Sequence, residues 1–433
     1  MARNARALRV AINAQLLPGG EVGGVEQFTM GLVHGLGRLS DGLEEYLIVG
    51  HWLHPDLLAP YIGPNQRILS GPRGTRIQRA KRIARRALGP LYAAGRKVWR
   101  AARTASAASQ QPSEVPESGG FFESLDVDLV HFPYQHFVRC NLPTIYNPHD
   151  VQHLHYPEFF TPEQIRWRET LYKAGCRESQ AVAVDSASAR DDIVTRYSVD
   201  PRNVFVILPG PPTELYEPPN DAALAMVKRK SRLPEAFALY PAQTWPHKNH
   251  LRLLEALALL RNTHRLSLSL VCTGRKNEHW PKIRQRMREL RLQDSVRFLG
   301  FVGTTEMRAL YRLAQFVIFP SLFEGAGLPV LEAFAEGTPV ACSAVTSLVE
   351  YGGDAVLPLD PTSVESIADA IRRMSSDGEL RASLRERGLA RKRLFSWERA
   401  AKTYRALYRR IARRPLTDED RELLAAAQVS QTG

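Results

Sequence analysis

Residues 316–343 read FVIFPSLFEGAGLPVLEAFAEGTPVACS, and this stretch predicts the fold. The run 315–320 is apolar and rich in β-branched and aromatic residues, which is typical of a buried strand. A loop with two glycines follows at 321–327. The segment 328–336 then reads as a helix, with proline in its first turn and glycine just past its end. A second buried strand is expected at 339–342, so the order is that of a parallel α/β sheet.

Two carboxylates lie within this unit. Glu324 is in the loop and Glu332 is about one turn into the helix, with seven residues between them. The free N–H groups of a loop and a helix N-terminus favour a phosphate group. Two acids beside such a site make sense if the ligand also carries hydroxyls, which carboxylates accept well. The segment alone equally allows one glutamate in a loop and another on a solvated helix face.

The whole stretch resembles the donor-binding signature of glycosyltransferase family 4, whose members are retaining enzymes of the GT-B fold. Weaker features of the family run from about residue 8 to about residue 410. The resemblance implies two doubly wound Rossmann-like domains facing a cleft, with a C-terminal helix that crosses back to the first domain. It also implies transfer of a sugar from a nucleoside-diphosphate-sugar to an acceptor hydroxyl, without a metal or other cofactor.

Length, charge and cysteines place the chain in a broad class. A chain of 433 residues is expected to form two domains. The sequence holds no apolar run of about 18 residues and no apolar leader at its start, so we expect a cytoplasmic protein. The four cysteines are scattered, which favours free thiols over disulfides or a metal site.

The net charge of +13 comes mainly from one segment, because 71–105 holds eleven Arg and Lys residues and no acid. Within it, 73–103 reads as two short cationic amphipathic helices, of the kind that lie on anionic membranes. We therefore expect attachment to the inner face of the membrane. Nucleic-acid binding is a less favoured alternative, and a solvated insertion is the third. Residues 104–120 read as a flexible linker.

Proline-rich residues 209–219, PGPPTELYEPP, separate two series of strands and helices. The element order on each side predicts an α/β domain. The predicted first domain is an acceptor-side domain at 1–212, with a basic insertion at 71–120. A nucleotide-sugar-binding domain at 213–395 follows. The chain then ends in a crossing helix at 396–414 and a tail without signals at 415–433.

A second glycine loop lies near the start of the chain, between a strand at 8–13 and a helix at 25–39. Its spacing differs from that of the dinucleotide fingerprint. The resemblance places Gly23 and Gly24 over the cleft near the donor diphosphate. Glycines needed only for a tight turn are the alternative.

His149 ends a predicted strand at 144–150, and functional groups in open α/β sheets gather at such strand ends. The resemblance places it near the donor sugar and the reacting centre. A metal cluster with His153 and His155 is a rival, although the further ligands that would strengthen it are missing; a purely structural histidine is another. Asp126-x-Asp128 is a weaker metal motif, which we interpret as the entry to a buried strand.

Lys248, in QTWPHKN, stands at the start of the helix that follows the first strand of the second domain. Its ammonium and the helix N-terminus would therefore meet the same phosphate. In the family this lysine binds the donor diphosphate, usually with an arginine five residues earlier. Here that position is Gln243, and Arg275 is a candidate replacement. A solvated Lys248 is the alternative.

The resemblance assigns a role to each of these residues. Glu332 would accept hydrogen bonds from the ribose, Glu324 would hold the donor sugar and His149 would position it from the other domain. Lys248, the glycine loop and the backbone N–H groups of the second loop would stabilise the leaving diphosphate; that second set comprises Gly325, Ala326, Gly327 and Leu328. The expected acceptor is a saccharide or a lipid-linked acceptor in cell-envelope polysaccharide or glycolipid synthesis.

Two rival interpretations remain. A sugar-nucleotide epimerase or a phosphorylase of the GT-B fold would share the same cleft. A non-catalytic protein that binds a membrane surface through 73–103 belongs to a different class. The glutamine at Gln243 is the feature that favours this second rival.

Overall fold

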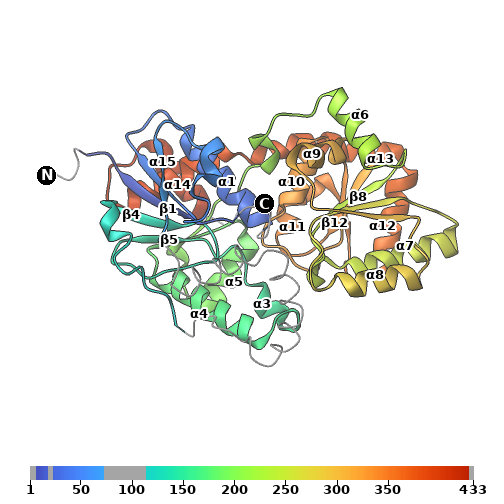
Figure 1. Ribbon diagram of the computed structural model, residues 1–433, viewed down its shortest axis with the longest axis horizontal. Coiled ribbons are helices and arrows are strands. Elements are labelled where there is room, and N and C mark those ends of the chain that lie inside the picture. Colours follow the sequence, from blue (N-terminus) through green and yellow to red (C-terminus); the bar gives the residue numbers. More distant parts are fainter. Residues whose placement is uncertain (1–5, 18–22, 73–113, 429–433) are drawn as a thin grey trace, which may run out of the picture.

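The computed structural model describes residues 6–17, 23–72 and 114–428. Within these ranges the chain forms two α/β domains side by side, each built on its own sheet (Figure 1). The predicted amphipathic helices of 73–103 and most of the predicted insertion lie outside the described residues. The α/β architecture with two Rossmann-like sheets is as predicted.

The first domain is built on a seven-stranded parallel sheet with the order β3-β2-β1-β4-β5-β6-β7. The order reverses between β1 and β4, which is the mark of a doubly wound sheet. The strands are β1 Arg9–Ala14, β2 Glu45–Gly50, β3 Gln66–Ser70, β4 Leu129–Phe132, β5 Thr144–Tyr146, β6 Ala181–Val184 and β7 Val204–Val206.

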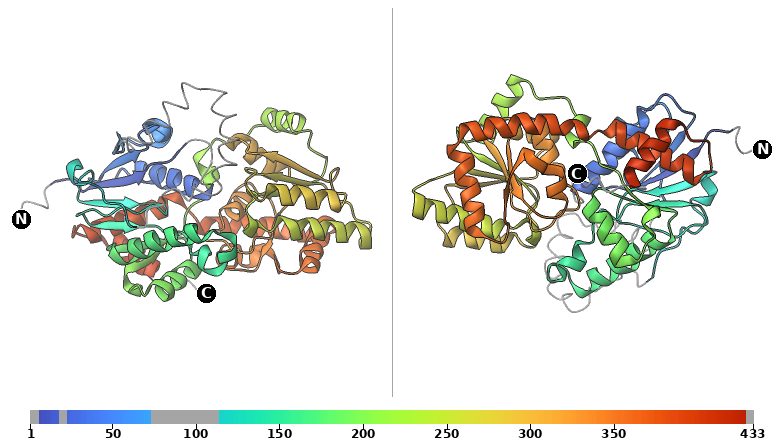
Figure 2. Two further views of the ribbon diagram at one scale, coloured as in Figure 1. Left: turned by 60° about the horizontal axis from the view of Figure 1, so that its bottom comes forward. Right: turned by 180° about the vertical axis from the view of Figure 1, so that it is seen from behind.

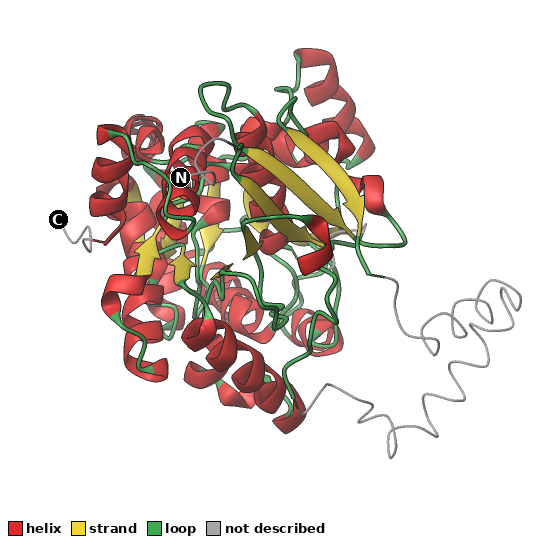
Figure 3. Cartoon of the chain, turned by 90° about the vertical axis from the view of Figure 1, so that its left-hand side faces the viewer, coloured by secondary structure: helices red, strands yellow, loops and turns green. Residues whose placement is uncertain are grey.

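The second domain is built on a six-stranded parallel sheet with the order β10-β9-β8-β11-β12-β13. Its order reverses between β8 and β11. Both sheets are seen with their strands in yellow in Figure 3. The strands are β8 Ala238–Pro241, β9 Leu270–Thr273, β10 Val296–Gly300, β11 Phe316–Phe319, β12 Val340–Ser343 and β13 Val356–Leu359.

Helices cover both faces of each sheet (Figures 1 and 3). Those of the first domain are α1 Gly24–Gly37, α3 Gln152–His155, α4 Pro162–Glu178 and α5 Ala187–Tyr197. Those of the second domain are α6 Asp221–Lys230, α7 His250–His264, α8 Trp280–Glu289, α9 Thr304–Leu313, α10 Leu328–Ala335, α11 Ser347–Gly352, α12 Val364–Ser376 and α13 Gly378–Arg391. The chain ends in α14 Trp397–Ile411 and α15 Asp418–Gln428.

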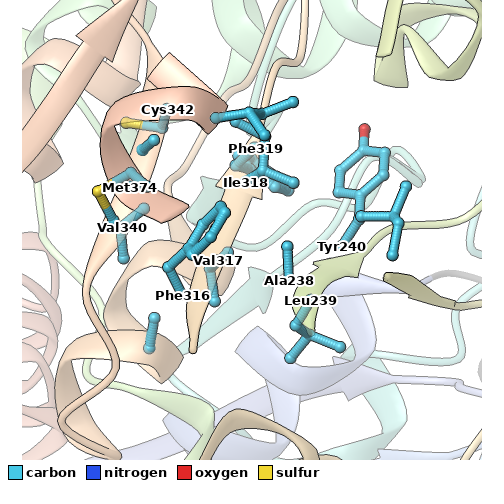
Figure 4. Packing of buried hydrophobic residues seen from close by; sticks show 14 of the residues in the cluster. Ala238, Leu239, Tyr240, Phe316, Val317, Ile318, Phe319, Val340, Cys342 and Met374 are labelled. Atoms are coloured by element: carbon cyan, nitrogen blue, oxygen red, sulfur yellow. The ribbon is translucent and has the colours of Figure 1, made fainter. Parts of the chain in front are cut away.

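The stretch that predicted the fold forms the centre of the second core. All four residues of β11 are fully buried, because α/β sheets are covered on both faces. Figure 4 shows Phe316 to Phe319 between the side chains of β8 and those of β12, with Met374 of α12 packed nearby. Burial of this kind contributes about 1.5–3 kcal/mol for each large apolar side chain.

Helix α14 belongs to the core of the first domain although it follows the second domain in sequence. The view from behind shows the chain passing from the second domain to the first at this helix (Figure 2). Trp397, Tyr404 and Tyr408 are buried there. The fit is close: a Cβ atom at Gly31 of α1 would lie 2.1 Å from the Trp397 ring, so only glycine is accommodated.

Several elements had no signal in the sequence, among them β3, α13 and α15. Strand β3 is an edge strand with half-buried residues, and α13 is polar along most of its length. Helix α15 lies in the tail, where we expected nothing, and it packs on α14. The buried Asp420 carboxylate of α15 lies 2.9 Å from Arg409 Nη1 of α14, which fixes this helix to its neighbour.

Two observations bear on the class of protein. Among the described residues, no helix is long and apolar enough to span a bilayer. The four cysteines are free thiols, and Cys176, Cys272 and Cys342 are buried.

Candidate functional site

The candidate site lies where both sheets reverse their strand order. Ligands of open α/β sheets bind outside the carboxyl ends of the strands at such a point. In the second domain, β8 leads into the segment of Lys248 and β11 leads into the loop of Glu324. In the first domain, β1 leads toward Gly23 and β5 leads into His149. Four strand ends therefore bring the predicted site residues to one place.

A cavity of about 630 Å³ lies at this place and is lined by both domains. This volume is within the usual range for small-molecule sites. All but one of the predicted site residues line it: Gly23, Gly24, His149, Lys248, Arg275, Glu324, Gly325, Ala326, Leu328 and Glu332. The exception is Gly327, where a Cβ atom would lie 2.8 Å from the Tyr351 ring. Gly327 permits this close packing of helix α10 and does not face the cavity.

Lys248 and Glu324 form an ion pair within the cavity. Lys248 Nζ lies 2.5 Å from Glu324 Oε1, and both side chains are largely buried. Lys248 ends a short 3-10 turn, Pro246–Lys248, directly before α7. A buried pair of this kind carries a desolvation cost, and removal of one partner would leave an uncompensated charge. Lys248 is therefore not the solvated side chain that the sequence alone allowed.

The loop that holds Glu324 is fixed on both sides. On its own domain, the Thr346 hydroxyl and the Ser347 hydroxyl donate to the Glu324 carbonyl at 2.9 Å each. On the first domain, the Ser186 hydroxyl donates to the Gly325 carbonyl at 3.1 Å. A Cβ atom at Gly325 would lie 2.9 Å from the His149 carbonyl oxygen, so this glycine allows the two domains to approach.

Glu332 lies in the same wall, on the first turns of α10. Tyr311 donates to Glu332 Oε2 at 2.8 Å. Burial raises the pKa of the Glu332 carboxyl to about 7, the Tyr311 hydrogen bond opposes this and the nearby Glu336 carboxylate adds to it. Glu332 is thus poised to change its charge near neutral pH.

The N-terminal glycine pair meets the second domain. Gly23 has a φ of +64°, and a Cβ atom there would lie 2.9 Å from the Gln243 amide nitrogen. Gly24 begins helix α1, and its Cβ would lie 3.4 Å from Leu328. Gln243, at the position of the expected arginine, accepts a hydrogen bond from Trp245 Nε1 at 3.0 Å. Arg275 lines the same cavity after β9.

His149 lies in the cavity wall with a φ of +64°, a left-handed conformation that is uncommon for a non-glycine residue. Its Nδ1 lies 2.6 Å from Asp185 Oδ2 and its Nε2 lies 3.0 Å from the Pro133 carbonyl oxygen. Both ring nitrogens therefore have partners within the protein. A direct hydrogen bond from the ring to a bound sugar would require the exchange of one partner.

The rival metal ligands have separate partners. His153 Nε2 lies 2.7 Å from Glu169, and His155 Nε2 lies 2.8 Å from Asp192. In the Asp-x-Asp motif, Asp126 and Asp128 are paired with Arg6, at 2.9 and 3.0 Å, and lie at the start of β4, away from the cavity. Within the described ranges, no three His, Cys, Asp or Glu side chains are arranged to hold a metal ion.

Two family models match the chain, one on each domain. The model described as Glycosyltransferase Family 4 matches residues 22–215, and the model described as Glycosyl transferases group 1 matches residues 224–391. The chain belongs to the family 4 glycosyltransferases. The second match contains Lys248, Arg275, Glu324 and Glu332, so the residues that carried the sequence resemblance lie within the matched part.

Curated relatives of this family 4 glycosyltransferase include bacterial glycosyltransferases. The O-antigen chain mannosyltransferase B of Escherichia coli is 31% identical over 58% of this chain and 66% of its own length. The D-inositol 3-phosphate glycosyltransferase of Corynebacterium glutamicum is 31% identical over 53% of this chain and 57% of its own length. The chain thus matches less than two thirds of the length of either relative.

Solved structures share the fold at low sequence identity. Anabaena HepE, solved in complex with UDP and glucose, has a TM-score of 0.64 at 16% identity and covers 92% of this chain and 99% of its own. WaaG, a glycosyltransferase involved in lipopolysaccharide biosynthesis, has a TM-score of 0.60 at 15% identity, with 98% and 100% covered. These likenesses establish the GT-B fold for this family 4 glycosyltransferase.

Several residues of this family 4 glycosyltransferase site had no local signal. Asp185 and Tyr311 are the partners of His149 and Glu332, yet they come from other elements of the fold. The first-domain wall contains Phe160, Trp167 and Arg168, which lie on or before α4. Trp167 and Arg168 lie on the predicted helix and Phe160 lies just before it, and only the tertiary arrangement places these residues in the cavity wall.

Proposed function

We propose that this protein transfers a sugar from a nucleoside-diphosphate-sugar to an acceptor hydroxyl, with retention at the anomeric carbon. One observation carries the proposal: Lys248, Glu324 and Glu332 line a single cavity where both sheets reverse their strand order. This cavity combines a cation for a diphosphate with carboxylates for sugar and ribose hydroxyls. A phosphate site alone would not need the two acids.

The donor would lie against the second domain. Lys248, next to the N-terminus of α7, would stabilise the diphosphate as it leaves, together with backbone N–H groups near Gly325 and Ala326. Lys248 would exchange Glu324 for the phosphate, and the released Glu324 carboxylate would accept sugar hydroxyls. Arg275 lines the cavity close to Gln243 and is our candidate for the second cation. The HepE structure with UDP and glucose supports a nucleotide donor, by analogy of fold.

Retention without a protein nucleophile would proceed by attack on the same face, assisted by the leaving phosphate. The family implies this route. We propose no metal or other cofactor for the reaction.

The acceptor would lie against the first domain. Phe160 and Trp167 give this wall apolar rings, and Gln152 and Gln164 give it amide groups. Aromatic faces with a few polar groups suit a saccharide. Arg168 adds a positive charge to this wall, and its guanidinium lies 4.8 Å from the centre of the Phe160 ring. The mannosyltransferase relatives support a role in cell-envelope polysaccharide or glycolipid synthesis.

Attachment to the inner face of the membrane is a separate part of the proposal. It depends on the eleven basic residues of 71–105 and no structural observation bears on it. Removal of 73–103 should reduce binding to vesicles of anionic lipid and leave the turnover of a soluble donor unchanged. Equal vesicle binding with and without 73–103 would contradict this part.

The proposal is tested by nucleotide release from a panel of UDP-, GDP- and ADP-sugars, with Glu332→Ala as the comparison. Turnover of one donor by the native chain, lost in the variant, is the expected result. Binding of a donor without turnover would show that the acceptor must be supplied. Failure of every donor to bind, measured by calorimetry, would favour a non-catalytic binding protein, and an epimerised or phosphorolysed product would favour the other rival.

A further inference from the structure

The ring of His149 contacts a hydrogen-bond acceptor on each of its two nitrogens. Nδ1 lies 2.6 Å from the Asp185 carboxylate and Nε2 lies 3.0 Å from the Pro133 carbonyl. A carbonyl oxygen only accepts, so Nε2 must carry a proton. The second proton is shared between Nδ1 and Asp185. Whichever atom holds it, the ring has no free lone pair.

Both partners are inside the protein. His149 is 6% exposed and Asp185 is 2% exposed, yet both line the cavity. Asp185 follows strand β6 directly, and the Tyr351 hydroxyl of the second domain donates to its main-chain carbonyl at 2.8 Å. The other carboxylate oxygen, Oδ1, has no hydrogen-bond partner among the described residues. The imidazolium is therefore the main compensation that this part of the structure offers to a buried carboxylate.

The His149 ring is also held by packing. Phe28 of helix α1 meets it edge to face, with ring centres 4.8 Å apart and planes at 80°. The ring therefore lies between an aromatic edge, a carboxylate and a carbonyl. Its orientation is determined before any ligand binds.

The charged and titratable groups around His149 come from three elements. Asp185 follows β6, Asp150 is adjacent in sequence, and His131 lies on β4. Burial opposes the charge of the His149 ring, but Asp185 and the Pro133 carbonyl outweigh it and raise the pKa of His149 above its ordinary value. His131 differs, because burial lowers the pKa of its ring to about 4 and keeps it neutral.

We propose that Asp185 is a positioning residue that holds His149 as a fixed imidazolium in the cavity wall, unable to accept a proton during sugar transfer. The role in transfer rests on the proposed function, whereas the charge state of the pair does not. The bond that breaks in transfer is that between the anomeric carbon and the leaving phosphate oxygen. The acceptor proton would then go to that phosphate oxygen and not to His149.

The charge state is tested by NMR on the full chain with ¹³C-labelled histidine, with the His149 signal assigned from His149→Gln. An unperturbed histidine loses its proton near pH 6.5. We expect the native His149 signal to remain in the imidazolium form at this pH and to titrate above it. Titration of the native His149 at or below the ordinary value would overturn the proposal, and this measurement requires no Asp185 variant to fold.

Activity tests the positioning role. Asp185→Asn should lower the pKa of His149. The kcat of this variant should recover as the pH is reduced from about 8 to about 6, while the native kcat stays nearly constant. Asp185→Glu, which keeps the charge, should restore the imidazolium signal and part of kcat. Asp191→Asn, on the exposed side of α5, is the matched control and should leave both unchanged.

The outcomes separate the two proposals. If the native chain neither binds nor turns over any donor, the proposed function fails, and the NMR result still decides the state of the pair. If donors are turned over but the kcat of Asp185→Asn is low at every pH, with His149 still protonated, Asp185 is only structural and the positioning role is overturned.

Discussion

Lys248 Nζ lies 2.5 Å from Glu324 Oε1, so the ammonium that is proposed to bind the diphosphate is already paired with the carboxylate that is proposed to hold the sugar. The two residues follow neighbouring strands, β8 and β11, at the point where the order of the second sheet reverses. In the unliganded protein, Glu324 therefore occupies Lys248 in place of the phosphate, and Lys248 occupies Glu324 in place of the sugar hydroxyls. Donor binding must open this contact.

The first prediction separates binding from transfer. Glu324→Gln should bind a nucleoside diphosphate more tightly, by about tenfold, because Lys248 no longer has a competing carboxylate, which corresponds to about 1.4 kcal/mol. The same variant should lose about 10²–10³ in kcat. Lys248→Met should lose both affinity and kcat. Calorimetry with UDP or GDP and a donor turnover assay measure the two effects.

A matched control for this pair is Lys230 with Glu306, which is an ion pair on the exposed surface of the same domain. Lys230→Met and Glu306→Gln should change neither quantity, since exposed pairs contribute little. Weaker nucleotide binding in Glu324→Gln would show that Glu324 and the phosphate do not compete for Lys248.

The second prediction concerns pH. The pKa of Glu332 is about 7, and its carboxylate form is the better acceptor of ribose hydroxyls. Affinity for a nucleoside diphosphate should therefore fall as the pH drops through about 7 in the native chain. Because the phosphate also titrates, the informative quantity is the ratio of native affinity to that of Glu332→Gln. A ratio that is constant with pH would exclude this role for Glu332.

Glu332 also affects the stability of the fold, and this effect depends on pH in the opposite direction to its effect on nucleotide affinity. Its folded-state pKa is raised above the ordinary value of 4.5, so the folded protein binds the extra proton. The stabilising contribution is complete below about pH 4.5 and is lost as the pH rises through about 7. Glu332→Gln should accordingly gain stability relative to the native chain above about pH 7, as measured by urea unfolding. Glu379→Gln, on the exposed first turn of α13, should show no such gain.

The third prediction concerns the contact of the two domains. In Gly325→Ala the new methyl group would lie 2.9 Å from the Asp150 Cβ and 2.9 Å from the His149 carbonyl oxygen. The domains should move apart, with a large loss of donor turnover and a larger radius of gyration in X-ray scattering. Gly378→Ala, where the nearest atom is the end of a flexible side chain at 3.7 Å, is the control. Full turnover in Gly325→Ala would show that this approach is not required.

The fourth prediction concerns the last helix. Asp420→Ala removes a buried carboxylate that accepts from Arg409 Nη1 and from the Thr417 backbone N–H, each at 2.9 Å. Stability should fall by about 2–3 kcal/mol while donor turnover at low temperature is unchanged. Asp418→Ala, whose side chain is 92% exposed, should be neutral. An effect of Asp420→Ala on turnover without loss of stability would argue against a purely structural role.

Most of the architecture followed from local patterns in the sequence. Strand β11 and helix α10 are encoded by an apolar run, glycines and a first-turn proline, all within one stretch. The polar helices α13 and α15 and the half-buried strand β3 were not predicted. Helix α15 is held by a contact between helices, that of Arg409 with Asp420, which no local periodicity shows.

The candidate site could be predicted as far as the ends of its strands could be located in the sequence. Lys248, Glu324, Glu332 and His149 each follow a predicted strand or begin a predicted helix, and the structure brings them to one cavity. Their partners were not predictable. The pairing of Lys248 with Glu324 and of His149 with Asp185 depends on which strands are neighbours, and strand order is not written in the spacing of residues. The roles of these residues stay predictions.

The position of helix α14 has a consequence for co-translational folding. The groove over Gly31 and Gly35 of α1 is filled by Trp397 and Ala401, which are synthesised about 190 residues after the last strand of the first sheet. The nascent first domain must therefore wait, with an apolar groove open to water, until nearly the whole chain has emerged. Premature termination anywhere in the second domain leaves that groove empty, and such products are natural targets for chaperones and proteases.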